Sequence, residues 1–230
     1  MKAMILAAGR GERMRPVSDA LPKALLPAAG KPLIMWTLEN LAAAGFREIV
    51  INYAHLGKLI ETALGDGTRF GVRIAYSPEK QALETAGGIA NALPLIGDEP
   101  FLVVNADIYC EIDYKLLLPV ARSLAETGYL AHLVMVDNPE HHQQGDFGLE
   151  QGKATVHGLP KFTYSGIGIY QPVLFANVAR GTKAKLAPLL RDQIEAGKVS
   201  GEHYQGLWMD IGTPERLQEL DRLLRANPAR

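Results

Sequence analysis

The chain has 230 residues, of which 47% are hydrophobic and 21% charged, so it can bury a core, and this composition excludes a collagen-like or disordered protein. Lysine and arginine number 24 against 25 acidic residues, and the formal charge of -1 supplies no global positive field, so we expect no nucleic-acid partner. Cys110 is the only cysteine, which excludes an internal disulfide and a cysteine-based metal cluster. No uncharged apolar run reaches about 18 residues, so no membrane span is expected and a cytoplasmic location fits.

Short apolar runs alternate with segments of helical period along most of the chain. The apolar runs predict strands over residues 3–7, 48–52, 73–76, 101–105 and 130–136. The periodic segments predict helices over residues 33–44, 55–64, 85–93, 114–126, 186–196 and 214–226. This alternation is typical of βαβ units and predicts an α/β fold with a mostly parallel sheet flanked by helices. The first run meets charge soon after Ala8, which favours a buried strand over a signal peptide.

The pattern changes after the fifth predicted strand. Residues 147–150 and 154–156 flank Gln151, Gly152 and Lys153, and this arrangement predicts a β-hairpin. We expect a small antiparallel insertion over about residues 137–170, forming a lid over the site, within a single domain that spans residues 1–230. No repeat, charge block or low-complexity linker divides the chain.

The connection over residues 9–32 follows the first predicted strand and has a length typical of functional loops. Its glycines let backbone N–H groups approach an anion closely, and its prolines stiffen the path between them. Its cations are Arg10, Arg13, Arg15, Lys23 and Lys31. Because parallel α/β sheets bind ligands at the carboxyl ends of their strands, this segment predicts a phosphate-binding loop. The alternative is a surface loop whose cations are merely solvated.

Two common phosphate-binding motifs do not match this loop. In a Walker A loop, Gly30-Lys31 would be followed by Ser or Thr instead of Pro32, and a glycine would replace Leu25. A dinucleotide fingerprint needs a glycine where Met14 stands and leads directly into a helix. The loop is therefore of another kind.

The long loop and three later blocks form one ordered pattern. The loop reads Leu6-Ala7-Ala8-Gly9-x-Gly11-x-Arg13-x-x-Pro16, then Pro22-Lys23-x-x-x-Pro27 and Lys31-Pro32. Together with residues 83–88, 103–107 and 208–213, this pattern resembles the sugar-1-phosphate nucleotidyltransferases. The resemblance implies a Rossmann-like sheet of the nucleotide-diphospho-sugar transferase type, with mixed pairing at one edge. Residues 137–147 and 185–204 are most similar to members that join UTP to N-acetylmuramate 1-phosphate in bacterial cell-wall recycling.

In the reaction that this resemblance implies, a sugar 1-phosphate oxygen attacks the α-phosphorus of a nucleoside triphosphate and pyrophosphate leaves. Such transfer depends on positioning and charge stabilisation. The resemblance assigns Arg13 to the β- and γ-phosphates and Lys23 to the phosphates of both substrates. It assigns Asp107 and Asp210 to Mg²⁺, an ion that prefers one or two carboxylates plus phosphates and water. Alternatively, each aspartate caps a nearby helix.

The resemblance also implies contacts with the base and the sugar. The nucleotide-binding residues expected are Leu6, Ala8, Gly9, Arg10, Gly11, Glu84, Gly88 and Asn105. Backbone groups near Ala8, Glu84 and Gly88 suit uracil, although Glu84 and Thr85 equally fit a helix start. The sugar-phosphate-binding residues expected are Asn138, Gly145, Asp146, Glu150 and Ser165. For the lactyl carboxylate of N-acetylmuramate, we predict a contact with Lys161 or with residues 141–145.

The chain departs from the family pattern in two places. Ala106 stands where relatives usually have glycine, so its methyl group could crowd the nucleotide. Leu159-Pro160-Lys161 does not match the Glu-Lys pair of longer relatives. Two alternatives therefore stay open: a guanylyl- or thymidylyltransferase acting on another hexose 1-phosphate, and a non-catalytic sugar-nucleotide sensor. The intact cations and aspartates argue against the sensor, and the sequence leaves the oligomeric state open.

Overall fold

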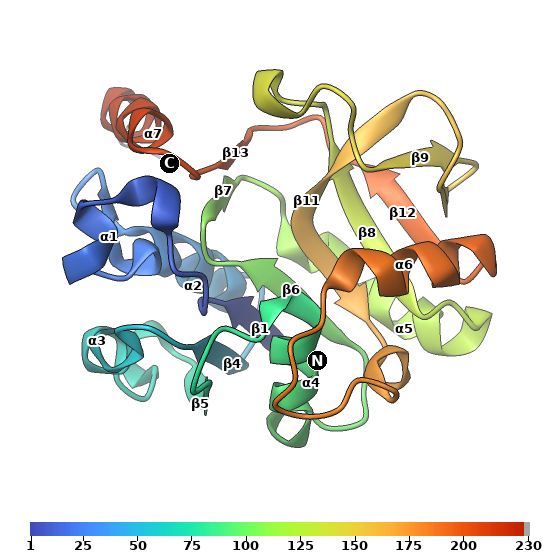
Figure 1. The fold of residues 1–230 in the computed structure, drawn as a ribbon, viewed down its shortest axis with the longest axis horizontal. Coiled ribbons are helices and arrows are strands. Elements are labelled where there is room, and N and C mark those ends of the chain that lie inside the picture. The colour runs from blue at the N-terminus through green and yellow to red at the C-terminus, as the bar shows by residue number, and fades with distance from the viewer. Residues whose placement is uncertain (228–230) are drawn as a thin grey trace.

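A nine-stranded mixed sheet forms the centre of the molecule in the computed structural model, which describes residues 1–227 (Figure 1). In spatial order the strands are β5 (Arg73–Pro78), β4 (Glu48–Tyr53), β1 (Ala3–Leu6), β6 (Phe101–Asn105), β11 (Lys161–Tyr170), β8 (Ala131–Val136), β12 (Val199–His203), β10 (Lys153–Thr155) and β9 (Phe147–Glu150). The strands from β5 to β6 pair in parallel, as do β8 and β12. The predicted α/β sheet flanked by helices is confirmed.

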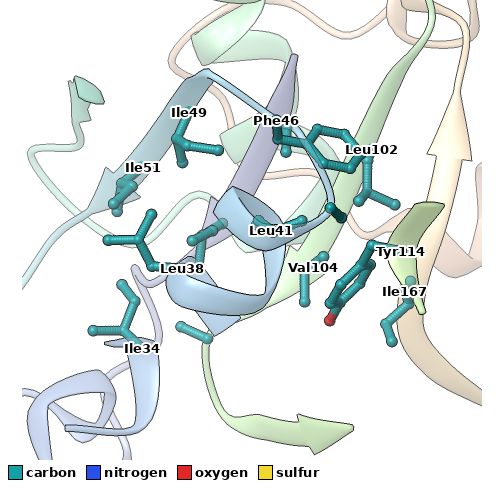
Figure 2. Packing of buried hydrophobic residues seen from close by; sticks show 14 of the residues in the cluster. Ile34, Leu38, Leu41, Phe46, Ile49, Ile51, Leu102, Val104, Tyr114 and Ile167 are labelled. Carbon is teal, nitrogen blue, oxygen red and sulfur yellow. The ribbon is translucent and has the colours of Figure 1, made fainter. Parts of the chain in front are cut away.

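Helices cover both faces of the sheet because successive residues of each buried strand point to opposite sides. On β1, Ala3 and Ile5 belong to one core cluster and Met4 belongs to the other. The first cluster includes side chains of α2 (Leu33–Ala43), α3 (Gly57–Leu64) and α5 (Leu117–Thr127). The second includes side chains of α4 (Glu84–Ile96) and α6 (Leu186–Glu195). The result is a three-layer α/β/α arrangement, and Figure 2 shows Leu38 and Leu41 of α2 packed in the first cluster.

A second, smaller unit of structure lies beside the long loop. Antiparallel β7 (Ile108–Cys110) and β13 (Trp208–Asp210) form a two-stranded ribbon. The loop contains α1 (Val17–Ala20) and the short strands β2 (Pro27–Ala28) and β3 (Lys31–Pro32). Helix α7 (Pro214–Ala226) packs against this region through a cluster that joins Met14 and Leu26 of the loop to Leu220 and Leu224. The predicted bounds of α7 match the structure.

The position of strand β11 shows that the expected insertion ends earlier than predicted. Its second half pairs antiparallel with β6 on one side and β8 on the other, so it lies in the middle of the sheet and the mixed pairing is not confined to one edge. The predicted hairpin is present as β9 and β10. Strand β11 therefore lies between β6 and β8 in the main sheet, and the hairpin strands β9 and β10 belong to the same sheet beyond β12. Among residues 1–227, no helix combines the length and the apolar character needed to cross a membrane.

Truncation of Leu41 tests the importance of the packing between α2 and the sheet. Leu41 is 0% exposed, whereas Leu59 on α3 is 39% exposed. We expect Leu41→Ala to lower the free energy of unfolding by about 2–5 kcal/mol, because it removes buried methyl groups and leaves a cavity. The control Leu59→Ala changes it by about 0.5 kcal/mol or less. Urea denaturation followed by circular dichroism measures both, and equal losses would contradict this account of the core.

Candidate active site

Two adjoining cavities lie where β1 and β6 end, which is the place where parallel α/β sheets bind ligands. The glycine-loop cavity, of about 330 Å³, is lined by Leu6, Ala8, Gly9, Arg10, Asn52, Ala82, Glu84, Thr85, Asn105 and Asp107. The carboxylate cavity, of about 370 Å³, is lined by Arg13, Asn105, Asp107, Ile108, Pro139, His141, His142, Thr163, Tyr164, Ser165, Gly166, Trp208 and Asp210. Asn105 and Asp107 are common to both, so the two cavities form one continuous site.

Lys23 lines neither cavity, but it reaches this site from the long loop by pairing with Asp107, which lines both. Its Nζ is 2.5 Å from Oδ2 of Asp107, and its side chain is only 11% exposed. Gly11 makes room for it: the backbone there has a φ of 63°, and an added Cβ would lie 3.2 Å from the Cβ of Lys23. Because a positive φ and a close approach both favour glycine, Gly11 shapes the loop around the lysine.

The ribbon of β7 and β13 brings Asp210 next to Asp107. Asp210 stands opposite Ile108 in the strand register, and the N–H of Ile211 donates to the carbonyl of Asp107 at 2.8 Å. Arg216 of α7 donates to Oδ1 of Asp210 at 2.5 Å, and Nε2 of His141 lies 3.0 Å from the same oxygen. Both aspartates therefore face the carboxylate cavity.

Arg13 lies at the same end of the cavity. A Cβ added at Gly212 would be 2.3 Å from Nη2 of Arg216 and 3.2 Å from Nη2 of Arg13, so both guanidinium groups border this glycine. The expected cations and carboxylates thus come together, although they are widely separated in sequence. Sequence reasoning missed Arg216, whose position depends on how α7 packs and carries no local signal.

The two aspartates do not cap helices. The short helix after β7 is capped by Asp113, and α7 is capped by Thr213, which accepts a hydrogen bond from the N–H of Arg216. The capping alternative for Asp107 and Asp210 is therefore wrong.

The donor set fits a hard divalent cation that also binds a ligand. Lys23 contacts Oδ2 of Asp107, and Arg216 and His141 contact Oδ1 of Asp210. In the part of the chain that the structure describes, each carboxylate keeps a second oxygen without a hydrogen-bond partner. Within residues 1–227, no group of three or more His, Cys, Asp or Glu side chains could hold a metal ion. The two aspartates are the residues that could hold such an ion, together with oxygen atoms of a bound ligand.

A buried hydrogen-bond chain fixes the walls of the glycine-loop cavity, and the sequence analysis missed it. The N–H of Ala7 donates to Oδ1 of Asn52 at 3.0 Å, and Nδ2 of Asn52 donates to Oε1 of Glu79 at 2.7 Å. The N–H of Leu83 donates to Oε2 of Glu79 at 2.9 Å. The chain thereby joins the start of the long loop to the start of α4. A polar residue inside a buried apolar strand, as Asn52 is in β4, was the available signal.

Glu79 is 7% exposed, and burial raises its pKa, while the hydrogen bonds from Asn52 and from the Leu83 N–H oppose that rise. Gly88 packs against this pair: a Cβ there would lie 2.7 Å from Nδ2 of Asn52 and 2.8 Å from Oε1 of Glu79. Gly88 does not line the glycine-loop cavity, so it supports the wall from behind.

Glu84 belongs both to the start of α4 and to the lining of the glycine-loop cavity, and its backbone conformation is unusual. Helix α4 begins at Glu84, whose φ of 62° lies in the left-handed region that side chains rarely adopt. Both Glu84 and Thr85 line the cavity, so the helix start and the site are the same structure. Ala106 is 2% exposed and packs in the first core cluster, so its methyl group is directed into the core and does not crowd this cavity.

A third cavity, of about 280 Å³, opens beside α6 and is called the α6 cavity below. It is lined by Glu84, Thr85, Asn105, Asp146, Phe147, Tyr164, Lys185, Leu186, Ala187, Leu190 and Arg191. It shares Asn105 with both other cavities and Tyr164 with the carboxylate cavity. Of the residues expected at the sugar, Asp146 lines the α6 cavity, where it accepts a hydrogen bond from the N–H of Tyr164 at 2.8 Å.

Three of the other residues expected at the sugar make contacts within the fold, and the fourth lies away from the three cavities. Ser165 lines the carboxylate cavity but is 1% exposed, and its Oγ donates to the carbonyl of Val134 at 2.7 Å. Asn138 donates to the carbonyl of Lys161 at 2.8 Å, and a Cβ at Gly145 would lie 2.8 Å from Oδ1 of Asn138. Glu150 is exposed at the end of β9 and lines none of the three cavities. The structure therefore does not bring it to the site.

Comparison with known proteins identifies the family. A model described as nucleotidyl transferase matches residues 2–227. The chain is 54% identical to the N-acetylmuramate alpha-1-phosphate uridylyltransferase of Neisseria meningitidis serogroup B, over 98% of this chain and 99% of that one. It is 29% identical to the mannose-1-phosphate guanylyltransferase catalytic subunit beta of Danio rerio, over 94% of this chain and 62% of that one.

The fold agrees with that assignment. It matches a Bacillus anthracis protein assigned as a glucose-1-phosphate thymidylyltransferase and crystallised with sucrose, with a TM-score of 0.83 at 21% identity, over 98% of this chain and 95% of that one. The chain belongs to the nucleotidyl transferase family. The family predicted from the sequence is confirmed.

Substitution of Glu79 tests the buried hydrogen-bond chain. Asn52 accepts from Ala7 through its oxygen, so its amide nitrogen must donate to Glu79. The two oxygens of Glu79 accept from Asn52 and Leu83, whereas glutamine offers one oxygen and places an NH₂ group against a donor. We expect Glu79→Gln to lower the free energy of unfolding by about 1–3 kcal/mol, measured by urea denaturation. The exposed control Glu99→Gln should leave it unchanged, and a neutral Glu79→Gln would overturn this interpretation.

Proposed function

We propose that the chain is a magnesium-dependent uridylyltransferase that converts UTP and N-acetylmuramate 1-phosphate into UDP-N-acetylmuramate and pyrophosphate, a step suited to the recycling of cell-wall sugars. The observation that carries the proposal is the convergence of Arg13, Lys23, Asp107 and Asp210 at the carboxylate cavity and its boundary with the glycine-loop cavity. The choice of UTP and of this sugar is supported by 54% identity over nearly the full length of a relative with that name.

The chemistry requires cations at specific atoms. An oxygen of the sugar 1-phosphate forms a bond to the α-phosphorus of UTP, the bond from that phosphorus to the bridging oxygen breaks, and pyrophosphate leaves with the electron pair. Lys23, paired with the Asp107 that lines both cavities, would bind phosphates of both substrates and reduce their repulsion. Arg13 would stabilise charge on the leaving group. Mg²⁺ held by Asp107 and Asp210 would supply further neutralisation of the phosphates.

The base would lie in the glycine-loop cavity. Backbone groups of Ala8 and Gly9 and the first turn of α4 line it, and the Asn52–Glu79 chain holds both walls in place. Rigid backbone donors and acceptors suit the alternating pattern of uracil without requiring a charged partner. Asn105 lines all three cavities, so it would lie close to the nucleotide and the sugar alike.

Removal of either cation should lower turnover strongly. We expect Arg13→Ala and Lys23→Ala to reduce kcat by about 100- to 1000-fold, because each removes a preorganised charge that acts on phosphate in the transition state. Arg15 offers a matched control in the same loop, since it pairs with exposed Asp19, whereas Lys23 pairs with Asp107 of the site. The measurement is pyrophosphate release. Activity of Lys23→Ala close to that of Arg15→Ala would rule out the assigned role of the lysine.

The choice of substrates and metal is tested by one grid of assays. Pyrophosphate release is measured with UTP, GTP, dTTP and ATP against several sugar 1-phosphates, with Mg²⁺ and with a chelator. We expect the highest kcat/KM for UTP with N-acetylmuramate 1-phosphate, loss of activity with chelator, and losses of about 100-fold or more in Asp107→Asn and Asp210→Asn. A preference for GTP or dTTP would support the alternative transferase, full activity with chelator would contradict the metal site, and silence across the grid would support a sensor.

A further inference from the structure

Two cations that the proposed reaction does not use line the α6 cavity. Lys185 precedes α6 and Arg191 lies on it, and both side chains line the cavity. Among residues 1–227, neither side chain has a hydrogen-bond or ion-pair partner. By contrast, Lys23 is paired with Asp107, and Arg216 is paired with Asp210. Arg10 of the glycine-loop cavity and Arg13 of the carboxylate cavity are likewise unpaired among these residues, so each cavity offers free positive charge, and in the α6 cavity it comes from Lys185 and Arg191.

The α6 cavity is continuous with the place where the phosphates would react. Its lining includes Asn105, which also borders the glycine-loop and carboxylate cavities. Phe147, Leu186 and Leu190 give the cavity an apolar part next to the two cations. A sugar joined to the reacting phosphate can extend into this cavity, with its ring against the apolar part and a substituent at the cations.

The acidic residues of the same cavity do not cancel these charges. Asp146 already accepts from the N–H of Tyr164 and lies 3.2 Å from Nε2 of His142. Glu84 also lines the glycine-loop cavity, so it lies at the end of the α6 cavity that the two share. Lys185 and Arg191 line neither of the other cavities, so they belong to the part of the lining that is not shared. An anionic group of a ligand would supply the partner that these two cations lack.

We propose that Lys185 and Arg191 form a carboxylate subsite that selects a sugar 1-phosphate with an anionic side arm over its neutral analogue. This inference rests on the proposed function, in which the lactyl ether of N-acetylmuramate supplies the carboxylate that N-acetylglucosamine lacks. It replaces the expected contacts. Lys161 lines none of the three cavities, and the histidines at 141 and 142 already face Asp210 and Asp146.

The test compares two substrates that differ only in that side arm. KM and kcat are measured with UTP and either N-acetylmuramate 1-phosphate or N-acetylglucosamine 1-phosphate for the wild type, Lys185→Gln, Arg191→Gln and the double variant. Each single substitution should raise KM for the carboxylated substrate about 10-fold, because it removes one charge-assisted hydrogen bond. KM for the neutral substrate and kcat for both substrates should each change less than about twofold. Lys198→Gln is the matched control, an exposed lysine just after α6 that lines none of the three cavities.

The outcomes separate the inference from the function on which it rests. A wild type that turns over neither substrate refutes the proposed function. If the wild type is active but the substitutions change KM for both substrates equally, or for neither, the carboxylate subsite alone is refuted. Calorimetric Kd values for UDP-N-acetylmuramate and UDP-N-acetylglucosamine give a second readout, in which the double variant should lose the preference for the first. A retained preference would overturn the proposal.

Discussion

In the antiparallel ribbon of β7 and β13, Asp210 stands opposite Ile108, and the N–H of Ile211 donates to the carbonyl of Asp107. This pairing decides which side chains can share the carboxylate cavity. It places two carboxylates from distant parts of the chain on one surface, where Lys23 and Arg216 each pair with one of them. Strand register fixes side-chain direction, since a slip of one residue would turn Asp210 to the other face. The ribbon is short, and the cluster of Met14, Ile211 and Leu220 supports it from the loop and from α7.

The two halves of the site are held by different kinds of interaction. Ion pairs and the ribbon organise the carboxylate cavity, whose aspartates stay partly exposed. The glycine-loop cavity is organised from behind, by the buried hydrogen bonds that join Ala7, Asn52, Glu79 and Leu83. Burial of Glu79 is unfavourable for its charge, and its two hydrogen bonds offset part of that cost. A hydrogen-bonded wall beside an ionic region suits a reaction that depends on positioning.

The fold was predictable where local pattern and tertiary structure agree. The apolar run of β6 and the period of α7 gave their bounds directly, because burial on both faces and amphipathicity leave distinct patterns. Strand β11 was not recognised as part of the main sheet, since Gly166 and a bulge interrupt its alternation and its partners are far away in the sequence. The short β12 was missed for a similar reason, because Gly201 and polar residues weaken its pattern.

The sequence predicted those site residues that belong to the ordered motif pattern. Lys23 and Asp107 lie together as the resemblance implied, whereas the partners of Asp210 depend on the packing of α7 and had no local signal. Asn138 and Gly145 are expected at the sugar from the sequence, but in the structure both shape the loop before β11. Polar type alone does not distinguish a residue that contacts a ligand from one that satisfies backbone groups.

The most direct measurement is a crystal structure of the protein with UTP and Mn²⁺, in which anomalous scattering locates the ion. The account predicts one ion bound by Asp107, Asp210 and a phosphate oxygen, with Nζ of Lys23 within hydrogen-bond distance of the triphosphate. An ion that contacts neither aspartate, or a lysine that contacts no phosphate, would contradict the account.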